Sequence, residues 1–173
     1  MRLLTIFTVT VLLAGCATSG RVMLTPVERD TIIASAASAI RDPDQLLALE
    51  VGSSGPTADA SFIALSQSGG PSKLAKQVAK LLSKAEGRTA SVLLFGPNSK
   101  KVRQVASDAL SLTRGNNLTK LTFLFHGDAC DFEQLKKEGD FPGTLIHVPG
   151  KNGPNTTSEG IRQPADGSPK PSM

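Results

Sequence analysis

The chain has 173 residues, with 19 lysines and arginines against 15 aspartates and glutamates, and it contains neither tryptophan nor tyrosine. A net charge of +4 with so few stacking aromatics does not fit the dense basic and aromatic surfaces of nucleic-acid binders, so we expect no nucleic-acid partner. The length is suited to one domain rather than several.

The first 15 residues have the features of an export signal. A single charge at Arg2 precedes an apolar run over residues 3–14. Such a run fits the roughly 7–15 residues of a secretory signal core and falls short of the ~20 residues that cross a bilayer. Small residues and then a cysteine close the segment as Leu13-Ala14-Gly15-Cys16, so we expect residues 1–15 to be removed.

The sequence Leu13-Ala14-Gly15-Cys16 resembles the lipobox of bacterial lipoproteins, and this resemblance covers residues 1–16 only. It implies cleavage before Cys16 and attachment of two or three acyl chains, such as palmitate, to that residue. Two chains hold a protein stably on a membrane. Ala17, where inner-membrane lipoproteins carry aspartate, implies the periplasmic face of the outer membrane. An ordinary signal peptide with an incidental cysteine is the alternative.

We expect a single α/β domain over residues 25–149, between a tether at 16–24 and a disordered tail at 150–173. The tail is rich in Gly, Pro, Asn, Ser and Thr, and its apolar side chains are too few to offset the entropy of ordering. Once Cys16 is acylated, Cys130 is the one remaining cysteine, so the domain is expected to fold without a disulfide.

Helices are expected at the start of the domain. Thr25 is a suitable N-cap, Pro26 suits the first turn, and Glu28 can complete a capping box. This pattern predicts a helix that continues to Arg41. A second, short helix is predicted from Asp44, and it would carry Leu46, Leu47 and Leu49.

Four short apolar runs predict the strands of a parallel sheet, because their apolar residues follow one another with little alternation, as in strands covered on both faces. These runs are residues 62–65, 92–95, 121–125 and 145–148. Helices are predicted between them over residues 71–86, 99–114 and 131–138. Right-handed crossovers would build from these elements a small α/β fold of Rossmann-like or flavodoxin-like type, with two or three layers. The N-terminal helix would cover a bare face of the sheet.

The loops that follow parallel strands are where ligands bind. Ser66-Gln67-Ser68-Gly69-Gly70 is similar to the Gly-x-Ser-x-Gly elbow of α/β-hydrolases, with its first glycine replaced. The order Ser68, then Asp128 or Asp131, then His147 agrees with the nucleophile, acid and base of that family. His147, however, falls inside a predicted strand, and too little chain precedes Ser68. A turn that leads into a helix is therefore the favoured interpretation.

His126-Gly127-Asp128-Ala129-Cys130-Asp131 is the densest group of coordinating side chains. Zinc accepts His, Cys and Asp but needs three or four ligands, and a Cys130–His126 nucleophile pair lacks a flanking basic group. We favour a helix cap at Asp128 or Asp131 and a buried Cys130. We expect no metal and no cofactor.

Four lysines recur at spacings of three and four residues on the helix predicted over 71–86, and so share one side of it. They are Lys73, Lys76, Lys80 and Lys84. These lysines are candidates for contact with anionic headgroups or an acidic partner, although a solvated face is the simpler interpretation.

The sequence favours a lipid-anchored envelope lipoprotein whose domain is a non-catalytic binding or assembly module for another envelope component, with an envelope protein as partner. The alternative is a periplasmic enzyme, or a binder of small ligands or anions, that uses the loops at the carboxyl ends of the strands. Its candidate residues are Ser68, His126, Asp128 and Cys130.

Overall fold

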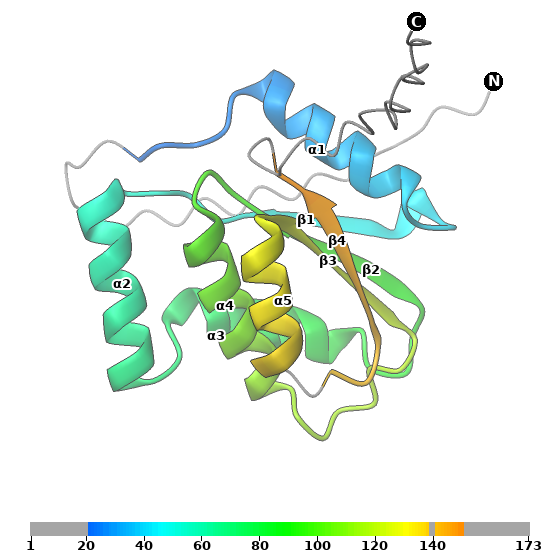
Figure 1. Cartoon of the computed structure of the whole chain (residues 1–173). Coiled ribbons are helices and arrows are strands. Elements are labelled where there is room, and N and C mark those ends of the chain that lie inside the picture. The colour runs from blue at the N-terminus through cyan, green and yellow to red at the C-terminus, as the bar shows by residue number, and fades with distance from the viewer. Residues whose placement is uncertain (1–20, 139–140, 151–173) are drawn as a thin grey trace, which may run out of the picture.

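The computed structural model describes residues 21–138 and 141–150. Four parallel strands form one sheet in the order β1-β2-β3-β4 (Figure 1). The strands are β1 (Leu46–Glu50), β2 (Ala90–Phe95), β3 (Leu121–Gly127) and β4 (Thr144–Pro149). The predicted class, a small α/β fold on about four parallel strands, is confirmed. The signal at 1–15, Cys16 and the tail beyond Gly150 lie outside the described residues.

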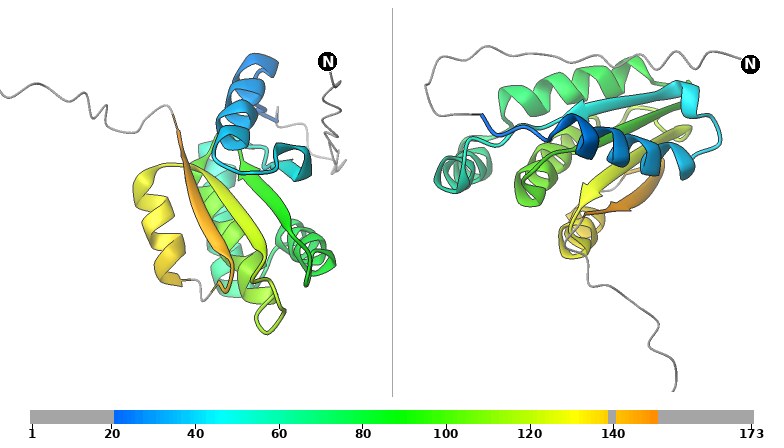
Figure 2. Two further views of the ribbon diagram at one scale, coloured as in Figure 1. Left: turned by 90° about the vertical axis from the view of Figure 1, so that its right-hand side faces the viewer. Right: turned by 90° about the horizontal axis from the view of Figure 1, so that it is seen from above.

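Helices cover both faces of the sheet and make three layers (Figure 2). Each crossover moves one strand onward in the same direction, so right-handed crossovers place their helices on one face. That face carries α3 (Lys73–Lys84), α4 (Ser99–Leu112) and α5 (Ala129–Glu138), and α1 (Pro26–Ser38) covers the other. Because the described strand order never reverses, the sheet has no switch point of the kind that binds nucleotides in doubly wound folds.

Helix α1 begins as the sequence predicts. The Thr25 hydroxyl accepts a hydrogen bond from the Glu28 N–H (3.3 Å), and the Glu28 carboxylate accepts one from the Thr25 N–H (3.2 Å). This capping box satisfies amides that the first turn leaves unpaired. The helix ends at Ser38, before the predicted Arg41, and packs Ile32 and Ala36 on the sheet.

The prediction for the first strand is wrong. Residues 62–65 belong to helix α2 (Pro56–Gly69), whereas the segment predicted as a short helix forms a 3-10 turn (Pro43–Gln45) and strand β1. The sequence Leu46-Leu47-Ala48-Leu49-Glu50 has high helix propensity. It nevertheless pairs with β2, and its alternate side chains pack against the clusters on the two faces of the sheet, so tertiary packing overrides local preference. The elbow-like segment at residues 66–70 therefore follows no strand, because residues 66–69 are the last turn of α2.

Helix α2 lies beside α4 and is attached to it largely through polar side chains. Its buried residues are Asp59 and Ser66. Asp59 pairs with Lys101 of α4, and Ser66 donates a hydrogen bond to Asp108 of α4. The larger apolar core lies between the sheet and α3, α4 and α5.

The last residues of the expected tether contact the domain. Val22 forms an antiparallel bridge with Ser53, and its N–H donates to the Ser53 carbonyl (2.9 Å). The Leu24 N–H donates to the Glu50 carboxylate (2.8 Å). The chain thus joins the folded body at the end of β1. Among the described residues, no helix is both long enough and apolar enough to cross a membrane.

Candidate functional site

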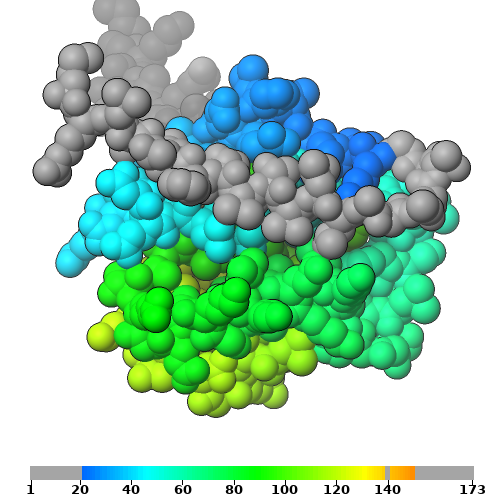
Figure 3. Space-filling view, turned by 180° about the vertical axis from the view of Figure 1, so that it is seen from behind, coloured from blue at the N-terminus to red at the C-terminus, as the bar shows by residue number. Residues whose placement is uncertain are grey.

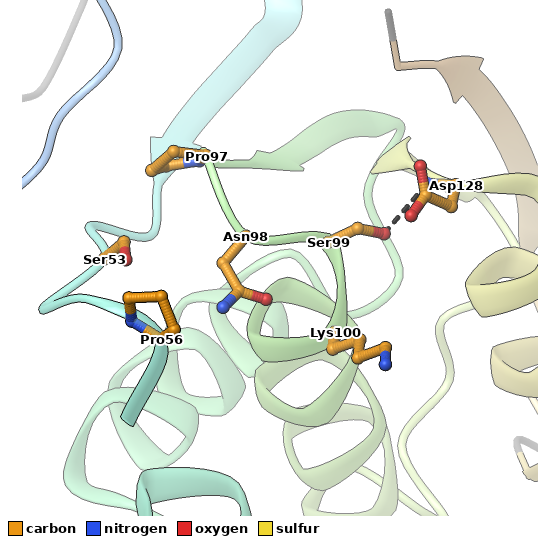
Figure 4. Close-up of a pocket in the computed structure, with 7 residues that line it drawn as sticks. All are labelled: Ser53, Pro56, Pro97, Asn98, Ser99, Lys100 and Asp128. Carbon is orange, nitrogen blue, oxygen red and sulfur yellow. Dashed lines mark hydrogen bonds between the residues drawn. The ribbon is translucent and has the colours of Figure 1, made fainter. Parts of the chain in front are cut away.

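An open pocket of about 320 Å³ lies at the carboxyl edge of the sheet, where α2, α4 and α5 begin (Figure 4). This is the edge at which parallel sheets bind ligands. The lining residues come from the loops after β1, β2 and β3 and from the first turns of α2 and α4, and they are Ser53, Pro56, Pro97, Asn98, Ser99, Lys100 and Asp128. Lys100 and Asp128 bring opposite charges to it.

A buried ion pair lies behind this pocket. The Lys101 Nζ is 2.8 Å from the Asp59 Oδ1, and the exposed fractions of the two side chains are 9% and 0%. Asp59 also accepts hydrogen bonds from the Ser53 hydroxyl (2.6 Å) and the Asn98 amide (2.9 Å). Burial by itself would raise the pKa of Asp59, but hydrogen bonds from Lys101 and Ser53 outweigh it and lower that pKa. The pair fixes the start of α2 on α4.

Ser99 joins α4 to the start of α5. Its hydroxyl donates to the Asp131 carboxylate (2.6 Å) and accepts from the Asp128 N–H (2.8 Å), and Arg103 pairs with Asp131 (3.3 Å). The buried Asp131 carboxylate thus connects the start of α5 to α4 through Ser99 and Arg103. Asp128 stands at the cap position, where its backbone carbonyl accepts from the N–H four residues on (3.1 Å). A Cβ on Gly127 would collide with the Ser99 hydroxyl and the Phe125 ring, so the junction needs glycine.

The two histidines lie on opposite faces of the sheet. His147 faces α5, where its ring stacks on Phe132 (centroids 4.9 Å apart) and its Nε2 is 2.9 Å from the Gly127 carbonyl oxygen. His126 is the register partner of Val148, which packs in the cluster under α1. The buried His126 Nδ1 has no hydrogen-bond partner among the described residues. Burial, and then the proximity of His147, lower the pKa of His126.

Ser68 lies far from this edge. It sits in the last turn of α2, is exposed, and donates its hydroxyl to the Ala64 carbonyl (2.9 Å). Pro56 lines the pocket at the start of the same helix, so a rise of ~1.5 Å per residue puts Ser68 about 18 Å along the helix axis from it. The proposed set of Ser68, Asp128 and His147 is not brought together.

Cys130 is exposed in the first turn of α5, so the prediction that it is buried is wrong. The buried side of α5 is formed instead by Asp131, Phe132 and Leu135. His126 lies on the α1 side of the sheet and α5 on the other, which separates the Cys130–His126 pair. Within residues 21–138 and 141–150, no group of three or more His, Cys, Asp or Glu side chains is arranged to hold a metal ion.

The four lysines of α3 share an exposed side of that helix, and we call them the lysine face. The opposite side of α3 buries Ala75, Val78, Ala79 and Leu82 in the core. In the part of the chain that is described, Lys73, Lys76, Lys80 and Lys84 form no ion pair. Figure 3 shows α3 (green) at the centre of one face of the molecule.

No family model matches the chain, and comparisons with curated proteins and with solved structures find no match. The interpretation of the pocket and the lysine face therefore depends on their own residues.

Proposed function

We propose that the chain is a lipid-anchored protein of the cell envelope, held at the periplasmic face of the outer membrane by acyl chains on Cys16. Its α/β domain is a non-catalytic module that binds an anionic component of the envelope. The lipobox sequence at 13–16 supports the anchor. The bridge between Val22 and Ser53 supports close attachment of the domain, because few residues separate Cys16 from the folded body.

The lysine face is the observation that carries the binding role. Neighbouring like charges on a helix destabilise it slightly, so a row without counter-charges weakens the isolated domain. The lysines of α3 form no ion pair in the described residues. They differ from single unpaired cations such as Lys100 and Lys137 because four of them lie together on one side of a helix. An anionic partner would supply the missing counter-charge.

A non-catalytic role is supported by the positions of the candidate catalytic groups. Ser68 lies at the far end of α2, His126 and His147 lie on opposite faces of the sheet, and Ser99 is engaged by Asp131 and the Asp128 N–H. Nucleophilic catalysis needs a nucleophile and a base within hydrogen-bond reach of each other. Ser68 does not meet that condition with either histidine, nor does Cys130 with His126. Ser99 meets it only with the Asp131 carboxylate, which is itself paired with Arg103.

A second candidate function is favoured by the pocket. Lys100 and Asp128 would suit a small ligand that carries both charges, and the ion pair behind them keeps the loops in place. Titration of the protein with zwitterionic metabolites, followed by chemical shifts of the loop amides, tests this function. Saturable shifts that Lys100→Ala and Asp128→Ala each abolish would favour it over the lysine face.

Fractionation and chemical footprinting test the proposal. Cys16→Ser should move the protein out of the membrane fraction. In intact envelopes, the lysine face should react with an acetylating reagent more slowly than in the detergent-solubilised protein, while exposed Lys100 and Lys137 react equally in both. Equal reactivity of the lysine face in the two states would contradict a binding role for it. Retention of Cys16→Ser in the membrane would contradict the anchor.

A further inference from the structure

We infer that the partner of the lysine face is the anionic phospholipid surface of the membrane that holds the anchor. This inference rests on the proposed acylation of Cys16. In this proposal α3 is a docking helix. It contacts the lipid headgroups and so fixes the orientation of the domain on the membrane.

The tether is short enough to keep the domain at the membrane. Six residues lead from Cys16 to Val22, where the chain joins the folded body. At ~3.3–3.6 Å per residue, this segment spans about 20 Å when fully extended. The headgroup surface is therefore always within reach of the domain, at the high effective concentration that a short linker gives.

The tether and the lysine face lie at the same edge of the sheet. Val22 pairs with Ser53, which follows the edge strand β1. Leu47 and Leu49 of β1 pack on the apolar cluster that includes the buried side of α3. Figure 3 shows α3 and the first described residues (dark blue) on one side of the molecule. A single plane can approach both.

Neighbouring elements do not neutralise the lysine face. Helix α3 contains no acidic residue, and the one charged residue of α2 is Asp59, which is buried against Lys101. Beyond the end of α3, the Glu86 carboxylate accepts a hydrogen bond from the Asn117 N–H (2.9 Å). The charges of Lys73 to Lys84 extend over ~16 Å along the helix axis, about twice the ~8 Å screening length of physiological salt.

The composition of the face favours lipid over an acidic protein. Protein interfaces are depleted in lysine and depend on buried aromatic or arginine anchors. The outer side of α3 offers lysine together with the small polar Ser83, and no aromatic residue. A lysine near an anionic lipid surface gains about fivefold in local affinity, equivalent to ~1 kcal/mol, without needing a complementary pocket.

Reconstituted vesicles test the inference with the mature, acylated full chain. The protein is inserted into vesicles of phosphatidylcholine alone or with phosphatidylglycerol added, and the acetylation rate of each lysine is read by mass spectrometry. On the anionic vesicles, we expect the lysine face to react about fivefold more slowly than on the neutral ones. In ~1 M salt, where the screening length is ~3 Å, the difference should disappear. Lys100 and Lys137 should react equally on both.

A second readout uses the native thiol. A fluorophore on the exposed Cys130 reports its distance from an acceptor dye in the bilayer. Docking should give different transfer efficiencies on neutral and anionic vesicles. Lys76→Gln/Lys80→Gln should remove that difference, and the charge-matched control Lys136→Gln/Lys137→Gln on α5 should retain it. All four lysines are exposed, so neither variant disturbs the core.

Each outcome decides between the proposals. Equal lysine reactivity on the two vesicle types overturns lipid docking. If the lysine face is protected in envelopes but not on anionic vesicles, its partner is an acidic macromolecule, so the docking inference fails while the proposed function stands. If Cys16 carries no acyl chain, the protein will not float with neutral vesicles, and the anchoring proposal itself fails.

Discussion

Lys101 of α4 and Asp59 of α2 form an ion pair, with 2.8 Å between Nζ and Oδ1, in which both side chains are almost fully buried. The ammonium group also donates to the Gly52 carbonyl (2.9 Å) and lies over the Phe62 ring at 4.9 Å. One side chain thus joins the loop after β1 and two helices. This contact positions the pocket.

Removing one partner of this pair should be costly, because the other charge is left buried. We expect Asp59→Ala to lower the free energy of unfolding by about 3–5 kcal/mol in urea titrations. Asp59→Ala/Lys101→Met should recover part of that loss, since no unpaired charge remains. A loss below ~1 kcal/mol in the single variant would show that Lys101 reaches water without its partner.

Gly127 should not accept a side chain. The Cβ of Gly127→Ala would collide with the Ser99 hydroxyl and the Phe125 ring, and we expect a loss of about 1–3 kcal/mol in unfolding free energy. Gly69→Ala is the matched control, because that helical glycine has open space around its Cβ position. The control should be neutral or stabilise by up to ~1 kcal/mol. Equal effects of the two substitutions would contradict the packing described.

His126 should make stability depend on pH. Burial lowers its pKa in the folded protein, so the unfolded chain, with an ordinary pKa of about 6.5, binds the proton more readily. Stability attributable to His126 is therefore fully present above pH ~6.5 and is lost as pH falls below that value toward the lowered pKa. Thermal melts of His126→Leu should show a weaker pH dependence there. If the pH dependence of the melting temperature is the same in His126→Leu as in the parent protein, His126 is not its cause.

The variant His126→Leu should still unfold in acid, because Asp59 also makes stability depend on pH. The lowered pKa of Asp59 gives stability that is present above its ordinary value near 3.8 and is lost as pH falls through the folded pKa. Both the parent protein and His126→Leu should therefore lose stability below pH ~4. This shared loss is an internal control for the histidine effect.

Ser68 and Cys130 should be dispensable for folding. Both are exposed, and Ser68 bonds only to its own helix. We expect Ser68→Ala and Cys130→Ser each to change the unfolding free energy by less than ~0.5 kcal/mol. A larger loss from either substitution would indicate contacts that the described residues do not show.

Local signals in the sequence predicted much of this fold. Thr25, Pro26 and Glu28 define the start of α1 without reference to the rest of the chain. The continuous apolar runs of β2 and β3 reflect burial on both faces, whereas the run in the edge strand β4 is half-buried and packs against both clusters. The spacing of lysines and apolar residues in α3 predicted one exposed and one buried side.

Elements that depend on distant partners could not be predicted in this way. Leu46–Glu50 becomes a strand because β2 is available to pair with it, and residues 62–65, though equally apolar, lie in a helix that starts at Pro56. The ion pair of Asp59 and Lys101 joins residues 42 positions apart. One feature of the sequence could have indicated a buried charge on α4. Lys101 adjoins Val102 and precedes Val105 by four residues, which places it on the inward side of the helix.

Intact-mass spectrometry of the protein purified from membranes tests the proposed acylation of Cys16. We expect a mature chain that begins at Cys16 and carries the mass of two or three acyl chains on that residue. A free thiol at Cys16, or a chain cut at a different bond, would contradict it.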